Sequence, residues 1–225
     1  MSTRGRSGPV DIAEVLRDAH LGDLRRLHEE PIEYDSLHGA TVRLFALLED
    51  HSIPYVLVGG MAMLQYVDGR NTRDIDLIMA FADLRRVPGL VIESSDKDFA
   101  RASFDGVQIN LRLTSNALFR AVEKRFAGTR TFAEREIRTA TPEGLVLLKL
   151  FALPSLYRQG DTVRAAIYET DVRVLLDRYE VSTEVVLAEL AKHVLATDVV
   201  AIREILADIE ARIASPDRFA RESGS

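Results

Sequence analysis

The stretch that decides the fold is Arg73-Asp74-Ile75-Asp76-Leu77-Ile78-Met79, which places two aspartates one residue apart inside an apolar run. In a β-strand, residues i and i+2 point to the same face and lie roughly 6–7 Å apart. Asp74 and Asp76 should therefore share one face, while Ile75 and Leu77 point to the other. Neighbouring carboxylates are what a pair of Mg²⁺ ions, about 3.5–4 Å apart, needs for phosphoryl chemistry. The stretch thus predicts a strand with a metal site on one face.

A glycine pair precedes this strand. Gly59 and Gly60 follow the strand-like run Tyr55–Val58 and come before the helical pattern Met61–Tyr66. Glycines at such a place let the backbone approach a phosphate, and a helix start offers free N–H groups. Asp-x-Asp alone is typical of a solvated strand face. The glycines before it favour a nucleotide site beside a metal site.

Two segments carry a resemblance to a known family. They are Val58-Gly59-Gly60-Met61-Ala62 and Arg70-Asn71-Thr72-Arg73-Asp74-Ile75-Asp76-Leu77, which resemble the signature of the polymerase-β-like nucleotidyltransferase superfamily. The second segment is most similar to the AbiEii and MenT group of toxin nucleotidyltransferases. The resemblance spans about residues 40–180. It implies an α/β (α+β) fold, with a nucleotidyltransferase core whose mixed β-sheet is flanked by helices, and a helical C-terminal subdomain.

The resemblance also implies an activity and its partners. The substrate would be an NTP, the cofactor Mg²⁺, and the most favoured acceptor the 3′ end of a tRNA. Transfer of a nucleoside monophosphate there would block aminoacylation and translation. A separately encoded antitoxin would complete a toxin–antitoxin system.

The turn before the carboxylates holds further candidates for nucleotide binding. Arg70 and Arg73 flank it and could bind phosphates, although solvated turn arginines are an equally good interpretation. Thr72 lies two residues before Asp74, so its hydroxyl should point to the carboxylate face. In some members of the MenT group a hydroxyl at this place is phosphorylated by a kinase-like antitoxin. The resemblance therefore implies a regulatory phosphosite at Thr72; the simpler alternative is a hydrogen bond within the turn.

The third carboxylate of the superfamily is missing at its expected position. That position falls in the strand-like run Val107–Leu113 and is occupied by Asn110. An amide can orient a metal-bound water but carries no charge, which puts full two-metal chemistry in doubt. One Mg²⁺ whose shell is completed by nucleotide phosphates remains consistent with the sequence. Asp105 is close by, but its place in an Asp-Gly turn favours a structural role.

Two charged residues interrupt apolar faces in the C-terminal part. After Thr141-Pro142, which reads as a helix start, residues 145–153 are apolar on all sides except for Lys149. The next helix, from Asp161, carries an apolar stripe broken by Asp171: Val163, Ile167, Asp171 and Leu175.

Two interpretations of this pair stay open. Lys149 and Asp171 could form a buried ion pair that joins two helices. In the other interpretation Lys149 binds the triphosphate and Asp171 orients it or assists proton removal. The resemblance implies a helical Lys and a downstream Asp here, with Arg158 as a further nucleotide-binding residue.

The remaining pattern divides the chain into segments. We expect helices at residues 10–27, from Ser36 to Leu48, and from Asn116 to Phe126, and strands near 90–93, 99–104, 107–113 and 136–139. From residue 141 onwards the pattern is almost entirely helical. The predicted divisions are an N-terminal extension with a disordered start (1–35), the nucleotidyltransferase core (36–140), the helical C-terminal subdomain (141–214) and a tail (215–225).

Composition narrows the function classes. The 225 residues carry a net charge of −6 and no cysteine, which excludes disulfides and thiolate catalysis. No apolar run approaches membrane-spanning length, so we expect a cytoplasmic protein without a membrane partner.

Two alternatives to the tRNA-directed enzyme stay open. One is a nucleotidyltransferase that modifies a small molecule or a protein, because the acceptor lies outside the motifs. The other is a catalytically degenerate nucleotide- or RNA-binding protein, which Asn110 suggests.

Overall fold

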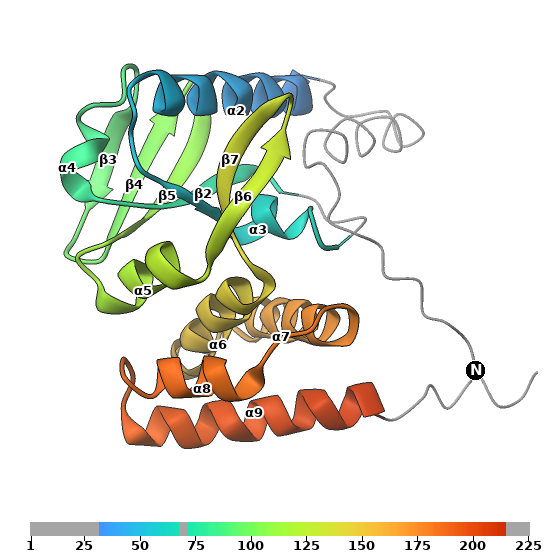
Figure 1. Cartoon of the computed structure of the whole chain (residues 1–225). Helices are drawn as coiled ribbons and strands as arrows, with labels where there is room; N and C mark the ends of the chain where they lie inside the picture. The colour runs from blue at the N-terminus through green and yellow to red at the C-terminus, as the bar shows by residue number, and fades with distance from the viewer. Residues whose placement is uncertain (1–31, 68–71, 215–225) are drawn as a thin grey trace, which may run out of the picture. The chain divides into compact units, whose positions relative to one another are not determined.

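The computed structural model describes residues 32–67 and 72–214 (Figure 1). The chain divides into two compact units, residues 1–141 and 142–225. This boundary falls one residue beyond the predicted end of the core. The predicted disordered start, the helix at 10–27, the tail and Arg70 lie outside the described residues.

A seven-stranded mixed sheet forms the centre of the first unit. Its order is β3-β4-β5-β2-β1-β7-β6. The pairs β2–β5 and β1–β7 are parallel, and the other neighbours are antiparallel. The predicted α/β class with a mixed sheet is therefore confirmed. The strands are β1 (Val56–Val58), β2 (Asp74–Met79), β3 (Val91–Ser95), β4 (Phe99–Phe104), β5 (Val107–Leu113), β6 (Ala127–Phe132) and β7 (Arg135–Ala140).

One face of this sheet is apolar and packs against α2 (Ile32–Asp50). Phe45 of α2 stacks on Tyr55 with 5.4 Å between ring centroids and meets Phe132 edge-on at 5.2 Å. The predicted helix from Ser36 begins four residues too late, because the preceding residues continue the helix. The sheet residues of this face are buried: Leu57, Ile75, Leu77, Ile109 and Leu111.

Shorter helices lie on the side of the sheet away from α2 (Figure 1). In α5 (Ala117–Arg125), the side chain of Asn116 accepts a hydrogen bond from the Leu118 backbone N–H, as its predicted place at the helix start requires. Phe119 meets Phe99 of β4 at 5.4 Å. Two single-turn helices complete the unit, α3 (Gly59–Met63) and α4 (Phe81–Leu84).

Two tight hairpins differ in how visible they are in the sequence. The turn Asp105-Gly106 joins β4 to β5 with positive φ angles of 50° and 80°, as the Asp-Gly pair predicts. Ala133 and Glu134 join β6 to β7, also at positive φ, 45° and 68°. Neither residue type signals such a turn, so the sequence did not reveal β6 and gave β7 only as a short extended segment.

The second unit is helical, as predicted. Its helices are α6 (Pro142–Arg158), α7 (Thr162–Arg178), α8 (Thr183–Leu190) and α9 (Ala196–Ala214), and α6 contacts the other three. Asp161 caps α7 by accepting from the Arg164 N–H. Within the described residues, no helix combines the length and apolarity needed to cross a bilayer.

The predicted apolar stripe of α7 is wrong in its first half. Val163 and Ile167 are exposed, whereas Ala165, Val172 and Leu175 are buried. A spacing of four drifts about 40° per step around a helix of 3.6 residues per turn. Val163 and Ile167 therefore lie outside the inward face of α7. That face contains Ala165 and Val172, which are seven residues, or about two turns, apart.

Candidate functional site

The two aspartates lie on one face of β2 beside the parallel strand β5. Asp74 stands in register with Gln108, and Asp76 stands in register with Asn110. Alternation turns Ile75 into the opposite face, where it is fully buried. The sequence-predicted arrangement of the carboxylates is therefore present in the fold.

Asp74 has only neutral hydrogen-bond partners among the described residues. The Asn110 amide donates to Asp74 Oδ2 at 2.6 Å, and the Thr72 hydroxyl lies 3.3 Å from Asp74 Oδ1. Burial and the nearby charge of Asp76 raise the pKa of the Asp74 carboxyl, and these two hydrogen bonds oppose the rise. Within the described part of the chain, no cation therefore compensates the negative charge of Asp74.

Asp76 is held differently, by a cation and by close packing. The Arg112 guanidinium donates to Asp76 Oδ1 at 2.9 Å. A Cβ added to Gly59 would lie 2.0 Å from Asp76 Oδ2, and Gly59 has φ +66°. Gly59 is therefore required both by its backbone conformation and by the space that Asp76 occupies.

The second glycine makes room for Thr72. A Cβ on Gly60 would lie 2.7 Å from the Thr72 hydroxyl, which is only 7% exposed as a residue. The glycine pair thus lets the side chains of Asp76 and Thr72 approach the backbone. The sequence pattern had instead predicted that a phosphate would approach the backbone there. Roles of Gly59 and Gly60 in nucleotide binding stay predictions, and Arg73 is exposed just before β2.

Two arginines on this face were missed by the sequence analysis. Arg112 follows Asn110 by two residues on β5, so the same alternation that places Asn110 also places Arg112. Arg101 of β4 stands in register with Asn110 and is exposed. Extending the period-two pattern beyond the expected third carboxylate would have found Arg112.

Lys149 and Asp171 form a buried ion pair inside the second unit. Lys149 Nζ lies 2.6 Å from Asp171 Oδ2, and both side chains are almost wholly buried. The ammonium also lies 4.5 Å from the centre of the Tyr168 ring. The buried ion pair that the sequence offered as one interpretation is therefore formed. A role of Lys149 and Asp171 in catalysis stays a prediction.

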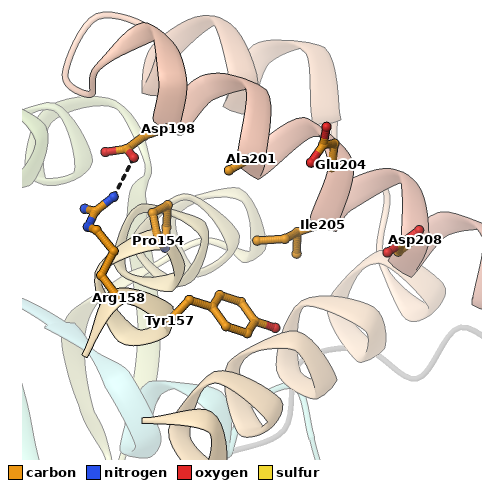
Figure 2. Close-up of a pocket in the computed structure, with 8 residues that line it drawn as sticks. All are labelled: Pro154, Tyr157, Arg158, Asp198, Ala201, Glu204, Ile205 and Asp208. Carbon is orange, nitrogen blue, oxygen red and sulfur yellow. Dashed lines mark hydrogen bonds and ion pairs between the residues drawn. The ribbon is translucent and has the colours of Figure 1, made fainter. Parts of the chain in front are cut away.

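Arg158 lies on the opposite side of α6 from Lys149. The two are nine residues apart, which is about half a turn out of phase at 3.6 residues per turn. Arg158 pairs with Asp198 of α9 at 2.7 Å, at the edge of a hollow of about 390 Å³ (Figure 2). Asp198, Glu204 and Asp208 also line this hollow, and their charges do not favour a phosphate. Nucleotide binding by Arg158 stays a prediction.

Comparison with known proteins bears on the fold. No protein-family model matches the sequence, and no curated protein gives a significant match. An antigenic nucleotidyltransferase-like protein from Paracoccidioides brasiliensis matches with a TM-score of 0.53 and 15% identity, over 82% of this chain and 95% of that one. This chain has the fold of a nucleotidyltransferase-like protein.

Two structures of the antibiotic-resistance factor ANT(2'')-Ia are more distantly similar, each with 12% identity. A solution structure has a TM-score of 0.49, over 77% of this chain and 95% of that one. A crystal structure in complex with adenylyl-2''-tobramycin has 0.46, over 69% and 96%. None of the three is described as an AbiEii or MenT toxin, so that finer assignment stays a prediction.

The residues on this face of the sheet could hold a divalent cation. Carboxylate and amide oxygens are ligands that Mg²⁺ accepts. Asp74 and Asp76 supply the carboxylates, and rotation of the Asn110 amide would present its oxygen. No cluster of three or more His, Cys, Asp or Glu able to hold a metal occurs among residues 32–67 and 72–214. The donor set fits one ion better than two, because Asp76 is already paired with Arg112.

Proposed function

We propose that this chain is a nucleotidyltransferase that moves a nucleoside monophosphate from an NTP to an acceptor hydroxyl. The observation that carries this proposal is the pair of adjacent carboxylates, Asp74 and Asp76, on one face of the central sheet of a nucleotidyltransferase-like fold. The neutral partners of Asp74 support it, because a half-buried carboxylate beside a second carboxylate, with its pKa raised, is typical of functional sites.

In the proposed reaction, the acceptor oxygen forms a bond to the α-phosphorus of the NTP. The bond from that phosphorus to the oxygen that bridges the α- and β-phosphates breaks, pyrophosphate leaves with the bonding electrons, and the acceptor proton passes to water. Asp74 would hold Mg²⁺, with Asp76 as a second candidate ligand, and the hydrogen bonds from Thr72 and Asn110 orient Asp74. Bound Mg²⁺ would neutralise charge on the phosphate oxygens.

As the acceptor we propose the 3′ end of a tRNA, in the cytoplasm, with a separately encoded antitoxin. The support is the resemblance of residues 70–77 to the AbiEii and MenT group. The test is incubation of the purified protein with Mg²⁺, each labelled NTP in turn and a total tRNA pool. We expect label on tRNA 3′ ends. Label only on a protein or a small-molecule hydroxyl would keep nucleotidyl transfer and exclude this acceptor.

A second candidate is a degenerate nucleotide- or RNA-binding protein. Two observations favour it: Asn110 stands where a third carboxylate is expected, and Arg112 already pairs with Asp76. The same incubation separates the candidates. Mg²⁺-dependent release of pyrophosphate in the presence of an acceptor supports the enzyme, and nucleotide binding without any release supports the binding protein.

We further propose that phosphorylation of Thr72 inactivates the enzyme. Its hydroxyl lies 3.3 Å from Asp74 Oδ1, so a phosphate there would bring about −1.5 to −2 charges beside the metal ligands. Because Thr72 is buried, a kinase would have to open this turn first. The test is mass spectrometry of protein co-expressed with its genomic neighbour, followed by the transfer assay. Fully phosphorylated Thr72 with unchanged transfer would exclude this control.

A further inference from the structure

The two aspartates of the site differ in what compensates their charge. Asp74 has the neutral Asn110 amide at 2.6 Å and the Thr72 hydroxyl at 3.3 Å. Asp76 has the Arg112 guanidinium at 2.9 Å on Oδ1, and Gly59 packs against Oδ2. Neutral partners can rotate aside when a cation arrives. A guanidinium must give up a charge-assisted contact first, which costs more.

Arg112 is built into this site by the sheet. Asn110 and Arg112 project from the same face of β5. Asn110 is in register with Asp76 but contacts Asp74, and Arg112 is in register with Ile78 but contacts Asp76, so each side chain contacts the residue two positions earlier on β2. The side chains of Arg112 and Asp76 are 21% and 12% exposed, so solvent screens this pair only partly. A second metal ion at Asp76 would meet this fixed positive charge.

We propose that Arg112 supplies the second positive charge of the site, so that one divalent cation binds through Asp74 while the guanidinium contacts the nucleotide phosphates. This inference rests on the proposed nucleotidyl transfer. The chemistry suits the role, because a guanidinium matches phosphate oxygens with a planar pair of donors and stays charged at any physiological pH. It also accounts for Asn110: with one ion, a third carboxylate is not needed.

A purely structural role for Arg112 predicts the opposite sign in a binding experiment. If Arg112 only holds Asp76 in position, its removal should misplace a ligand and weaken metal binding. If it takes the place of a metal charge, its removal frees Asp76 and strengthens metal binding. The sign of the change therefore decides between the two.

The experiment titrates Mn²⁺ into the full chain without nucleotide and follows free Mn²⁺ by electron paramagnetic resonance. The variants are Arg112→Gln and a matched control, Arg101→Gln. Arg101 lies on the same face two strands from β2, about 9–10 Å away, and its side chain makes no hydrogen bond or ion pair with the residues the structure describes. Both changes remove one positive charge, but only the first removes a contact with Asp76.

We expect wild type to bind one Mn²⁺, Arg112→Gln to bind at least about fivefold more tightly, and Arg101→Gln to change affinity by less than about twofold. Without metal, Arg112→Gln should bind a fluorescent NTP analogue at least about fivefold more weakly. Unchanged or weaker Mn²⁺ binding by Arg112→Gln would overturn the inference, as would unchanged or tighter binding of the analogue.

Two further measurements keep the outcome interpretable. Arg112→Met retains most of the apolar stem and replaces the glutamine variant if that variant does not fold. Asp74→Asn should abolish Mn²⁺ binding in every background. If neither wild type nor Arg112→Gln binds Mn²⁺, with or without nucleotide, both this inference and the proposed function fail. If wild type binds one ion and Arg112→Gln does not bind it more tightly, only this inference fails.

Discussion

Two of the places where the described residues bury charge differ in whether the charges cancel. In the helical unit, Lys149 and Asp171 neutralise each other at 2.6 Å. In the sheet unit, Arg112 pairs with Asp76, whereas the hydrogen-bond partners of Asp74 among the described residues are neutral. The charges of the first pair cancel in the folded chain, whereas we expect the second pair to be stabilised when a cation binds. Incomplete compensation is therefore a better indicator of a ligand site than burial of charge.

The largest effect should follow from removing the charge of Asp74. We expect Asp74→Asn to lower nucleotide transfer by at least about 10³-fold, because a lost metal ligand removes several kcal/mol of charge stabilisation. The assay is label transfer with the acceptor identified above. Asp105→Asn is the matched control, since Asp105 lies in an exposed turn. Activity of Asp74→Asn within about threefold of wild type would show that the Asp74 carboxylate is not needed for transfer.

The second test asks whether the Lys149–Asp171 pair is complete in itself. Lys149→Met and Asp171→Leu alone should each lower the free energy of unfolding by about 3–5 kcal/mol, because each strands a buried charge. The double variant should recover most of that loss. Urea denaturation measures all three. Arg158→Met, which breaks an exposed pair, should cost less than about 1 kcal/mol.

The activity of the folded double variant then separates the two interpretations of this pair. If the pair is only structural, transfer by the folded double variant should stay near the wild-type rate. A stable double variant with transfer lost would give Lys149 and Asp171 a role in catalysis.

A third test concerns the space that Asp76 needs. Gly59→Ala and Gly106→Ala both place alanine at positive φ, which costs roughly 1–2 kcal/mol. Nothing lies within 4 Å of a Cβ on Gly106, whereas one on Gly59 would collide with Asp76. We expect Gly59→Ala to lower the free energy of unfolding by about 1–3 kcal/mol more than Gly106→Ala. Equal losses in urea denaturation would show that the collision is absent.

The smallest effect concerns pH. Because the pKa of Asp74 is raised in the folded state, the folded protein binds this proton more tightly than the unfolded chain does. Stability therefore falls as pH rises from the ordinary Asp value of about 3.9 through the raised value. Asp74→Asn lacks this penalty, so its melting temperature should exceed that of wild type by a margin that grows between about pH 4 and pH 7. A margin that shrinks over this range would contradict the assignment, and added Mg²⁺ should stabilise wild type only.

The sequence predicted most of what depends on local pattern. Alternation placed Asp74 and Asp76 on one face, and the family resemblance pointed to Asn110. An apolar helix with a single lysine predicted the buried pair as one of two interpretations. What it missed depends on contacts distant in sequence. Arg112 gains its meaning only from the parallel pairing of β5 with β2. The hairpin at Ala133-Glu134 adopts a turn that its residues do not favour. Exposure of Val163 follows from packing around the helix, which a spacing of four does not describe.

A Cβ at position 59 would collide with Asp76, so the residues tolerated at these two positions depend on each other. A side chain at position 59 is incompatible with a carboxylate at position 76, so a larger residue at position 59 is destabilising as long as Asp76 is retained. A descendant of this chain that lost Asp76 would no longer be constrained in space at position 59. In related chains, a larger residue at the first glycine should therefore accompany a small residue at the second aspartate, which gives a sequence marker for inactive copies.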